Sequence, residues 1–216
     1  MAKIKSCLFD LDGVIVDTAK YHFLAWKRLC NELGFDLNET ENENLKGISR
    51  AKSLEILLEK GKVRLSEEKR EMYMERKNNW YLEYVDEMSA SEILPGTLHF
   101  LNLCKEAGYH IALGSSSKNA LRILEKINIL ELFDAVIDGT KVSKGKPDPQ
   151  TFILGAEATK AHPSECVVFE DSIAGIEAGI AGGMYTVGIG NPKTLERANI
   201  VIPGFENVGL EIFEKL

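Results

Sequence analysis

The stretch that decides the fold is residues 4–14, which read IKSCLFDLDGV. Residues 4–9 form a short apolar run, which is typical of a buried β-strand. The run stops at Asp10, and Asp12 and Gly13 follow almost at once. Two acids placed directly after a buried strand stabilise nothing obvious in a fold. They are therefore the first candidates for a functional site.

Beyond residue 96, predicted helices and short apolar runs alternate along the chain. The runs expected as strands cover residues 110–114, 135–137, 166–169, 186–189 and, as an edge strand, 200–202. The helices expected between and before them cover residues 97–107, 118–127, 149–160 and 173–181. Alternating helices and strands indicate a parallel sheet with helices on both faces. We therefore expect an α/β fold with a doubly wound, Rossmann-like parallel-sheet core.

Residues 17–88 carry no strand signal and are expected to be entirely helical. His22, Trp26 and Leu29 recur at the spacing of one helical face, and serines at 49 and 66 can cap two further helices. This pattern predicts a helical cap domain inserted after the first strand. The core domain would then comprise residues 1–16 and 89–216, and the cap domain residues 17–88.

Composition excludes several classes of partner. The 216 residues contain 26 Lys and Arg against 33 Asp and Glu, so the net charge is −7. An acidic chain without a basic block is a poor binder of nucleic acid or anionic membranes. No uncharged stretch reaches the ~20 residues that a membrane helix needs. Because Asp10 and Asp12 interrupt the N-terminal apolar patch, we expect no signal peptide and a cytoplasmic protein, by default a monomer.

The four cysteines also suit a reducing compartment. They lie far apart in apolar segments, without any CxxC spacing, at Cys7, Cys30, Cys104 and Cys166. This distribution predicts buried free thiols.

Polar side chains follow several of the predicted strands. They lie in residues 115–119 (SSSKN), 144–149 (KGKPDP) and 170–172 (EDS). Ligands of such sheets bind beyond the carboxyl ends of the strands, so we expect these segments to meet near Asp10. Clustered carboxylates without cysteine or histidine suit Mg²⁺. With Mg²⁺ bound, an Asp can attack a phosphoryl group, while a lysine and a serine hydroxyl hold that group.

The motif FDLDGV at residues 9–14 resembles the nucleophile motif of the haloacid dehalogenase superfamily. Ser115, Lys146 and residues 170–172 match the second, third and fourth motifs of that superfamily in order. The resemblance implies that Asp10 is the nucleophile and Asp12 the general acid and base. An acid that must both donate and accept protons needs a pKa raised above its usual ~3.9.

The same resemblance implies a set of ligands. Asp10, the backbone carbonyl of Asp12 and Asp171 would coordinate Mg²⁺, with Glu170 close by, directly or through water. The transferring phosphoryl group would be bound by Ser115 and Lys146.

Residues 17–22, 45–50, 76–78 and 115–119 are together similar to the β-phosphoglucomutases of this superfamily. These enzymes interconvert β-glucose 1-phosphate and β-glucose 6-phosphate through β-glucose 1,6-bisphosphate. The resemblance implies that the distal phosphate is held by Arg50, Ser117, Lys118 and Asn119. It also implies a hinge at Thr18, coupling of cap closure to Asp12 by His22 and Lys77, and substrate contacts from Trp26, Gly47 and Asn78. One departure is Gly114, where alanine is expected.

A mutase of this kind needs a second phosphate anchor and a closing cap. The bisphosphate must be held by either phosphate while the other reacts, and water must be kept from the aspartyl phosphate. A phosphatase of a small phosphorylated metabolite is the alternative function, and a non-catalytic sensor of sugar phosphates is a third.

Plainer structural roles remain open for several of these residues. His22 could be a core histidine, Lys77 a surface lysine packed on aromatics, and Lys146 an ordinary loop lysine. Ser115, Ser117, Asp148 and Ser172 could simply cap turns or helices.

Overall fold

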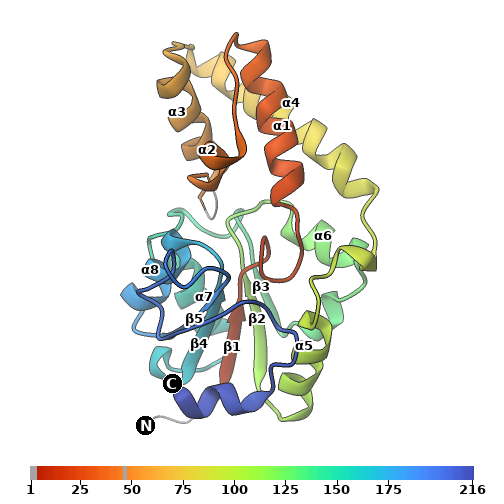
Figure 1. Cartoon of the computed structure of the whole chain (residues 1–216), viewed down its shortest axis with the longest axis vertical. Coiled ribbons are helices and arrows are strands. Elements are labelled where there is room, and N and C mark those ends of the chain that lie inside the picture. Colours follow the sequence, from red (N-terminus) through yellow and green to blue (C-terminus); the bar gives the residue numbers. More distant parts are fainter. Residues whose placement is uncertain (1–3, 46–47) are drawn as a thin grey trace.

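The computed structural model describes residues 4–45 and 48–216 (Figure 1). Its core is a sheet of six parallel strands in the order β3-β2-β1-β4-β5-β6. The strands are β1 (Ser6–Phe9), β2 (His110–Gly114), β3 (Ala135–Ile137), β4 (Cys166–Glu170), β5 (Tyr185–Ile189) and β6 (Ile200–Ile202). The predicted α/β doubly wound fold is confirmed, and the central position of β1 brings Asp10 to the middle of the sheet edge.

Eight α-helices accompany this sheet in the described part of the chain. They are α1 (Ala19–Glu32), α2 (Glu39–Glu43), α3 (Arg50–Gly61), α4 (Glu67–Asp86), α5 (Thr97–Glu106), α6 (Ala120–Lys126), α7 (Gln150–Ala158) and α8 (Ile173–Ala181). Short 3₁₀ turns cover Ala90–Glu92, Leu130–Leu132, Pro163–Glu165 and Leu210–Lys215. None of the described helices combines the length and the apolar composition that a membrane span requires.

The sheet is buried on both faces, as alternate residues of β1 show. Phe9 stacks on Phe169 with ring centroids 4.6 Å apart, on the side where Phe100 of α5 packs. Leu8 points to the opposite face and belongs to a second apolar cluster with Phe152 of α7 and Ala178 of α8. A parallel sheet covered by helices on both faces explains why its strands read as continuous apolar runs.

Helices α1 to α4 form a cap beyond the carboxyl ends of the strands (Figure 1). The two connections between cap and core run side by side, because Val16 and Ile93 form an isolated antiparallel bridge. The backbone N–H of Leu94 also donates to the carbonyl of Ile15 over 2.9 Å. All four helices lie inside residues 17–88, and the domain division proposed at that segment's ends stays a prediction.

Helix capping follows the sequence at most of the predicted starts. Ser49 and Ser66 cap α3 and α4 by accepting from the N–H groups of Lys52 and Lys69. Helix α2 was not predicted individually; its signal is a capping box in which Asn38 and Glu41 bond each other's backbone N–H.

Two helices begin later than predicted. Helix α6 begins at Ala120, since the Oγ of Ser117 accepts from the N–H of Asn119 and holds a turn before the helix. Helix α7 begins at Gln150, whose N–H donates to Asp148 over 3.0 Å. Both side chains therefore stabilise the turns that lead into the helices.

The four cysteines are free and buried, as predicted. The sulfurs of Cys7 and Cys104 lie 4.0 Å apart between β1 and α5. Burial raises the pKa of the Cys7 thiol well above its ordinary value, which disfavours the reactive thiolate.

Candidate active site

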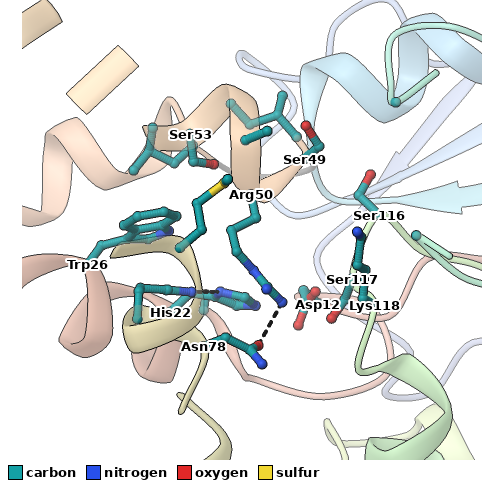
Figure 2. A pocket seen from close by; sticks show the side chains of 18 of the residues that line it. Asp12, His22, Trp26, Ser49, Arg50, Ser53, Asn78, Ser116, Ser117 and Lys118 are labelled. Carbon is teal, nitrogen blue, oxygen red and sulfur yellow. Dashed lines mark hydrogen bonds between the residues drawn. The ribbon is translucent and has the colours of Figure 1, made fainter. Parts of the chain in front are cut away.

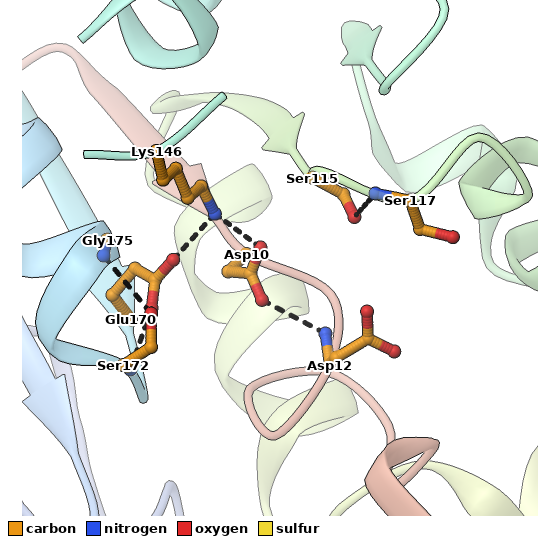
Figure 3. Close-up of polar contacts among 8 residues, drawn as sticks. All are labelled: Asp10, Asp12, Ser115, Ser117, Lys146, Glu170, Ser172 and Gly175. Atoms are coloured by element: carbon orange, nitrogen blue, oxygen red, sulfur yellow. Dashed lines mark hydrogen bonds and ion pairs between the residues drawn. The ribbon is translucent and has the colours of Figure 1, made fainter. Parts of the chain in front are cut away.

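Asp10 lies at the carboxyl end of the central strand. Its backbone N–H donates to the carbonyl of Phe169 over 3.0 Å and so continues the pairing of β1 with β4 by one residue. One carboxylate oxygen, Oδ2, accepts from the N–H of Asp12 over 3.1 Å. The other oxygen, Oδ1, lies 2.5 Å from the ammonium nitrogen of Lys146 (Figure 3). Asp10 is therefore held at both oxygens.

Lys146 bridges two carboxylates. Its Nζ lies 2.6 Å from Oε1 of Glu170 as well as against Asp10, and its side chain is fully buried. Burial acts to lower the pKa of Lys146, but the two carboxylates outweigh it, so the pKa lies above its ordinary value. Lys146 is thus a buried ion-pair partner rather than an exposed loop lysine.

The segment after β4 is built around the Glu170 carboxylate. Its Oε2 accepts from both the N–H and the hydroxyl of Ser172, each over 2.8 Å, and Ser172 also caps α8. A Cβ at Gly175 would lie 1.8 Å from the Glu170 carboxyl carbon. Only a glycine in the first turn of α8 leaves room for this buried acid.

Three carboxylates converge into a group that fits a divalent cation. Asp10, Glu170 and Asp171 each offer an oxygen, and these oxygens lie within 4.8 Å of one another. Gly13 makes this approach possible, because it has φ +81° and a Cβ there would lie 2.1 Å from Oδ2 of Asp171. An all-oxygen, largely buried donor set suits Mg²⁺ rather than zinc. The side chain of Asp12 is not part of this group.

Asp12 lies beside this cluster in an environment that favours its neutral form. Burial, and after it the negative charge of Asp10, raise the pKa of Asp12 to about 7, against the opposing effects of Lys146 and Lys77. Its Oδ1 is buried and has no hydrogen-bond partner among the described residues. Burial also raises the pKa of Asp10, to about 6, although Lys146 acts against that rise. Asp12 can therefore give or take a proton near neutral pH.

A cavity of about 530 Å³ lies between cap and core (Figure 2). The predicted site residues that line it are Asp10, Asp12, His22, Trp26, Arg50, Lys77, Asn78, Ser117, Lys118 and Asp171. Ser115 is buried beneath this lining, where its Oγ accepts from the N–H of Ser117 over 3.1 Å. Residues more than a hundred positions apart thus face one space.

The part of the cavity that the cap lines is organised by Asn78 of α4. Its Oδ1 accepts from Nη2 of Arg50 over 2.6 Å and from Nδ2 of Asn119 over 2.9 Å. Arg50 is the first residue of α3 in the cap, whereas Asn119 precedes α6 in the core. One amide oxygen therefore joins cap and core and holds two donors together.

Lys77 is buried in the cap beside aromatic rings. Its Nζ lies 2.8 Å from Nδ1 of His22, 4.6 Å from the ring centre of Trp26 and 4.9 Å from that of Tyr81. Burial, followed by the positive charge of Arg50, holds the pKa of Lys77 well below its ordinary value. Burial, followed by the charge of Lys77, does the same for His22, so the imidazole against the lysine is favoured in its neutral form. Lys77 does pack on aromatics, but it is not a surface residue.

Thr18 is fully buried directly before α1, at the connection between core and cap. Gly47 lies outside the described residues.

Sequence reasoning missed several residues that line the cavity. They are Asn42, Ser53, Glu71 and Glu75. Ser49 and Ser116 line the cavity too, and they lie in the segments 45–50 and 115–119 that the resemblance singled out. Ser49 and Ser53 are one helical turn apart on either side of Arg50, and Ser53 is only 3% exposed. The signal available in the sequence was the spacing of Ser49, at the helix cap, and Ser53, one turn later.

This chain is similar to known proteins in both sequence and structure. The family described as haloacid dehalogenase-like hydrolase matches residues 4–183. A β-phosphoglucomutase of Bacillus subtilis is 37% identical over 98% of this chain and 95% of its own. A phosphorylated carbohydrates phosphatase of Thermotoga maritima is 30% identical over 85% of this chain and 84% of its own. The crystal structure of a β-phosphoglucomutase from Clostridium difficile superposes with a TM-score of 0.95 at 40% identity, covering 98% of this chain and 96% of the other.

Proposed function

The chain belongs to the haloacid dehalogenase-like hydrolase family, and from that premise we propose that it is an Mg²⁺-dependent β-phosphoglucomutase. It would interconvert β-D-glucose 1-phosphate and β-D-glucose 6-phosphate. The reaction would pass through an aspartyl phosphate on Asp10 and through β-glucose 1,6-bisphosphate.

The observation that carries this proposal is a second set of donors besides Lys146. Arg50 and Asn119 converge on one oxygen of Asn78, which lines the cavity. A bisphosphate intermediate needs such an anchor, since one phosphate must be held while the other reacts. Arginine suits this role because its guanidinium can bind phosphate through two parallel hydrogen bonds. Ser117 and Lys118, which line the same cavity, would complete the anchor.

The two acids divide the chemistry of each transfer. In the first transfer, the sugar hydroxyl attacks the phosphorus of phosphorylated Asp10, Asp12 accepts the hydroxyl proton, and the bond between phosphorus and Asp10 breaks. In the second, Asp10 attacks the other phosphate of the bisphosphate, and Asp12 returns the proton to the departing sugar oxygen. A pKa of about 7 lets Asp12 serve both steps.

The remaining core residues hold the group in transfer. Lys146 and the hydroxyl of Ser115 would bind phosphoryl oxygens, since both lie at the same sheet edge as Asp10. Asp10, Glu170 and Asp171, together with the backbone carbonyl of Asp12, would hold Mg²⁺. When bound, Mg²⁺ neutralises charge on the phosphoryl oxygens.

The cap would keep water from the aspartyl phosphate. Its two connections to the core lie side by side at Val16 and Ile93, and Thr18 lies next to them, as a hinge requires. His22 and Lys77 would couple closure to the placement of Asp12, while Trp26 and Gly47 would contact the sugar. Exclusion of water is what separates a mutase from a phosphatase on this core.

A phosphatase of a phosphorylated sugar is the second candidate. The similarity to the Thermotoga maritima phosphatase, at 30% identity over most of both chains, favours it. The core machinery is compatible with either outcome, because both reactions form an aspartyl phosphate.

³¹P NMR of the protein with β-glucose 1-phosphate, Mg²⁺ and a trace of β-glucose 1,6-bisphosphate tests the proposal. We expect the 1-phosphate signal to be replaced by that of the 6-phosphate, with little free phosphate. Release of phosphate equal to the loss of substrate would instead establish a phosphatase. Tight Mg²⁺-dependent binding without any turnover would establish a non-catalytic sensor.

A further inference from the structure

Phe152 is an aromatic residue beneath the buried lysine of the site. It lies in the first turn of α7, six residues after Lys146, and its side chain is fully buried. The ammonium nitrogen of Lys146 lies 4.7 Å from the centre of its ring. This is the distance at which a cation is attracted to the face of an aromatic ring.

The ring differs from the other neighbours of Lys146 in staying unchanged during catalysis. When the Asp10 carboxylate, at 2.5 Å, becomes an acyl phosphate, its negative charge is replaced by that of the phosphoryl oxygens. Glu170, at 2.6 Å, also belongs to the carboxylate group that would hold Mg²⁺. Both ionic contacts therefore change as the reaction proceeds. The face of Phe152 offers a contact of constant strength.

Close packing confines the ring to this place. A Cβ at Gly114, the last residue of β2, would lie 2.8 Å from two carbons of the Phe152 ring. The apolar cluster of Leu8, Ala112 and Ala156 packs around the same side chain. Gly114, a departure from the resembled motif, thus leaves room for the ring at the end of the strand. Because the ring is closely packed, it can fix the distance between its face and the Lys146 ammonium.

We propose that Phe152 is a positioning residue whose ring face holds the Lys146 ammonium in place throughout phosphoryl transfer at Asp10. The expected change in kcat rests on the proposed function. The placement of Lys146 against the ring does not. Phe100 offers the contrast, because it is equally buried yet its ring contacts are with other phenylalanines, among them Phe9 and Phe169.

Stepwise fluorination of the ring tests the electrostatic part of this role. Phenylalanine analogues with one, two and three fluorines weaken the negative potential of the ring face while hardly changing its volume. With the analogues at position 152, we expect kcat to fall progressively, to about a tenth with three fluorines, and KM to change little. The same series at position 100 is the matched control and should leave kcat unchanged. An unchanged kcat across the series at position 152 would overturn the proposal.

A second measurement needs no turnover. ¹⁵N relaxation of the Lys146 ammonium reports how rigidly it is held, and we expect its order to fall in Phe152→Leu but not in Phe100→Leu. Unchanged order in Phe152→Leu would overturn the proposal even if catalysis suffered. Absence of phosphorylated Asp10 in the unaltered protein would overturn the proposed function instead, and the relaxation result would then decide the role of Phe152.

Discussion

The two ends of the cavity solve the problem of buried charge in opposite ways. At the core end, the ammonium of Lys146 lies against the carboxylates of Asp10 and Glu170, at 2.5 and 2.6 Å. At the cap end, Arg50 donates to the neutral amide of Asn78, and Nζ of Lys77 lies 2.8 Å from Nδ1 of His22. The core end contains its own counter-charges, whereas at the cap end Arg50 and Lys77 bond neutral groups.

This difference indicates that charge is balanced within the core end but not within the cap end. Burial lowers the pKa of both Lys77 and Arg50, because it disfavours their charged forms. An anion entering the cap end would relieve that cost. The core end would accept a phosphoryl group only with further positive charge, which a divalent cation would supply.

The largest expected effect is the loss of the nucleophile at the core end. Asp10→Asn should abolish phosphoryl-enzyme formation and lower kcat by more than about 10⁴-fold, because an amide cannot form the aspartyl phosphate. Rapid-quench labelling with ³²P-labelled substrate measures this. Asp148→Asn is the matched control, since Asp148 supports the turn before α7 and pairs with the exposed Lys144. Retained turnover in Asp10→Asn would show that Asp10 is not the nucleophile.

The next largest effect is expected from the acid and base. Asp12→Asn should lower kcat by about 10²- to 10⁴-fold while leaving binding of the sugar phosphate intact. Measuring kcat and KM separately tests this, and equal losses in affinity and turnover would contradict it.

Asp12 also gives a pH dependence of stability with a definite sign. Its pKa rises from 3.8 to about 7 on folding, so between these values the folded state binds more protons than the unfolded state. Its stabilising contribution is present below about pH 4 and is lost as the pH rises towards 7. In the metal-free protein, urea unfolding from pH 4 to 8 should show a smaller decline for Asp12→Asn than for the unaltered chain. Parallel curves would show that Asp12 is not perturbed.

A metal effect should follow from the glycine beneath Asp171. Gly13→Ala would place a Cβ 2.1 Å from the Asp171 carboxylate, so the Mg²⁺ concentration for half-maximal activity should rise by about 100-fold. Gly34→Ala is the matched control, because Gly34 has a similar φ of +88° with no atom within 4 Å of the added Cβ. Both variants should lose stability through backbone strain, and only the first should change the Mg²⁺ titration. The same Mg²⁺ shift in both would assign the effect to strain.

The anchor at the cap end should have a moderate effect. Arg50→Ala should raise KM for β-glucose 1-phosphate by about tenfold or more, as expected for the loss of a charged hydrogen bond to phosphate. Arg64→Ala, an exposed arginine of the same cap, is the control. An unchanged KM in Arg50→Ala would show that the second phosphate binds elsewhere.

The smallest effect is expected from adding a negative charge at the cap end. Asn78→Asp would place a carboxylate against Arg50 and Asn119, where it competes with a phosphate for both donors. We expect KM to rise a few-fold with kcat nearly unchanged. Asn79→Asp, on the exposed side of α4, is the control. A lower KM in Asn78→Asp would mean that the cap end does not bind an anion.

The sequence predicted the core end well, for a reason visible in the register. Phe9 pairs with Phe169, so the residues that follow them, Asp10 and Glu170, lie at the same level on neighbouring chains. Short apolar runs ending in acids already contain this information, because the carboxyl ends of parallel strands share one edge. Helix starts were predicted least well where side chains stabilised a turn before the helix, as at Asp148.

The alternation of apolar runs and helical periods in the sequence was therefore sufficient to predict the sheet, the inserted cap and the group of acids after β1 and β4. Tertiary structure alone decided that Lys146 is buried between two carboxylates, that Asn78 joins Arg50 to Asn119, and that the gap at Gly114 is filled by Phe152. Periodicity records which face of an element is buried, whereas such contacts depend on how elements distant in the chain pack against each other.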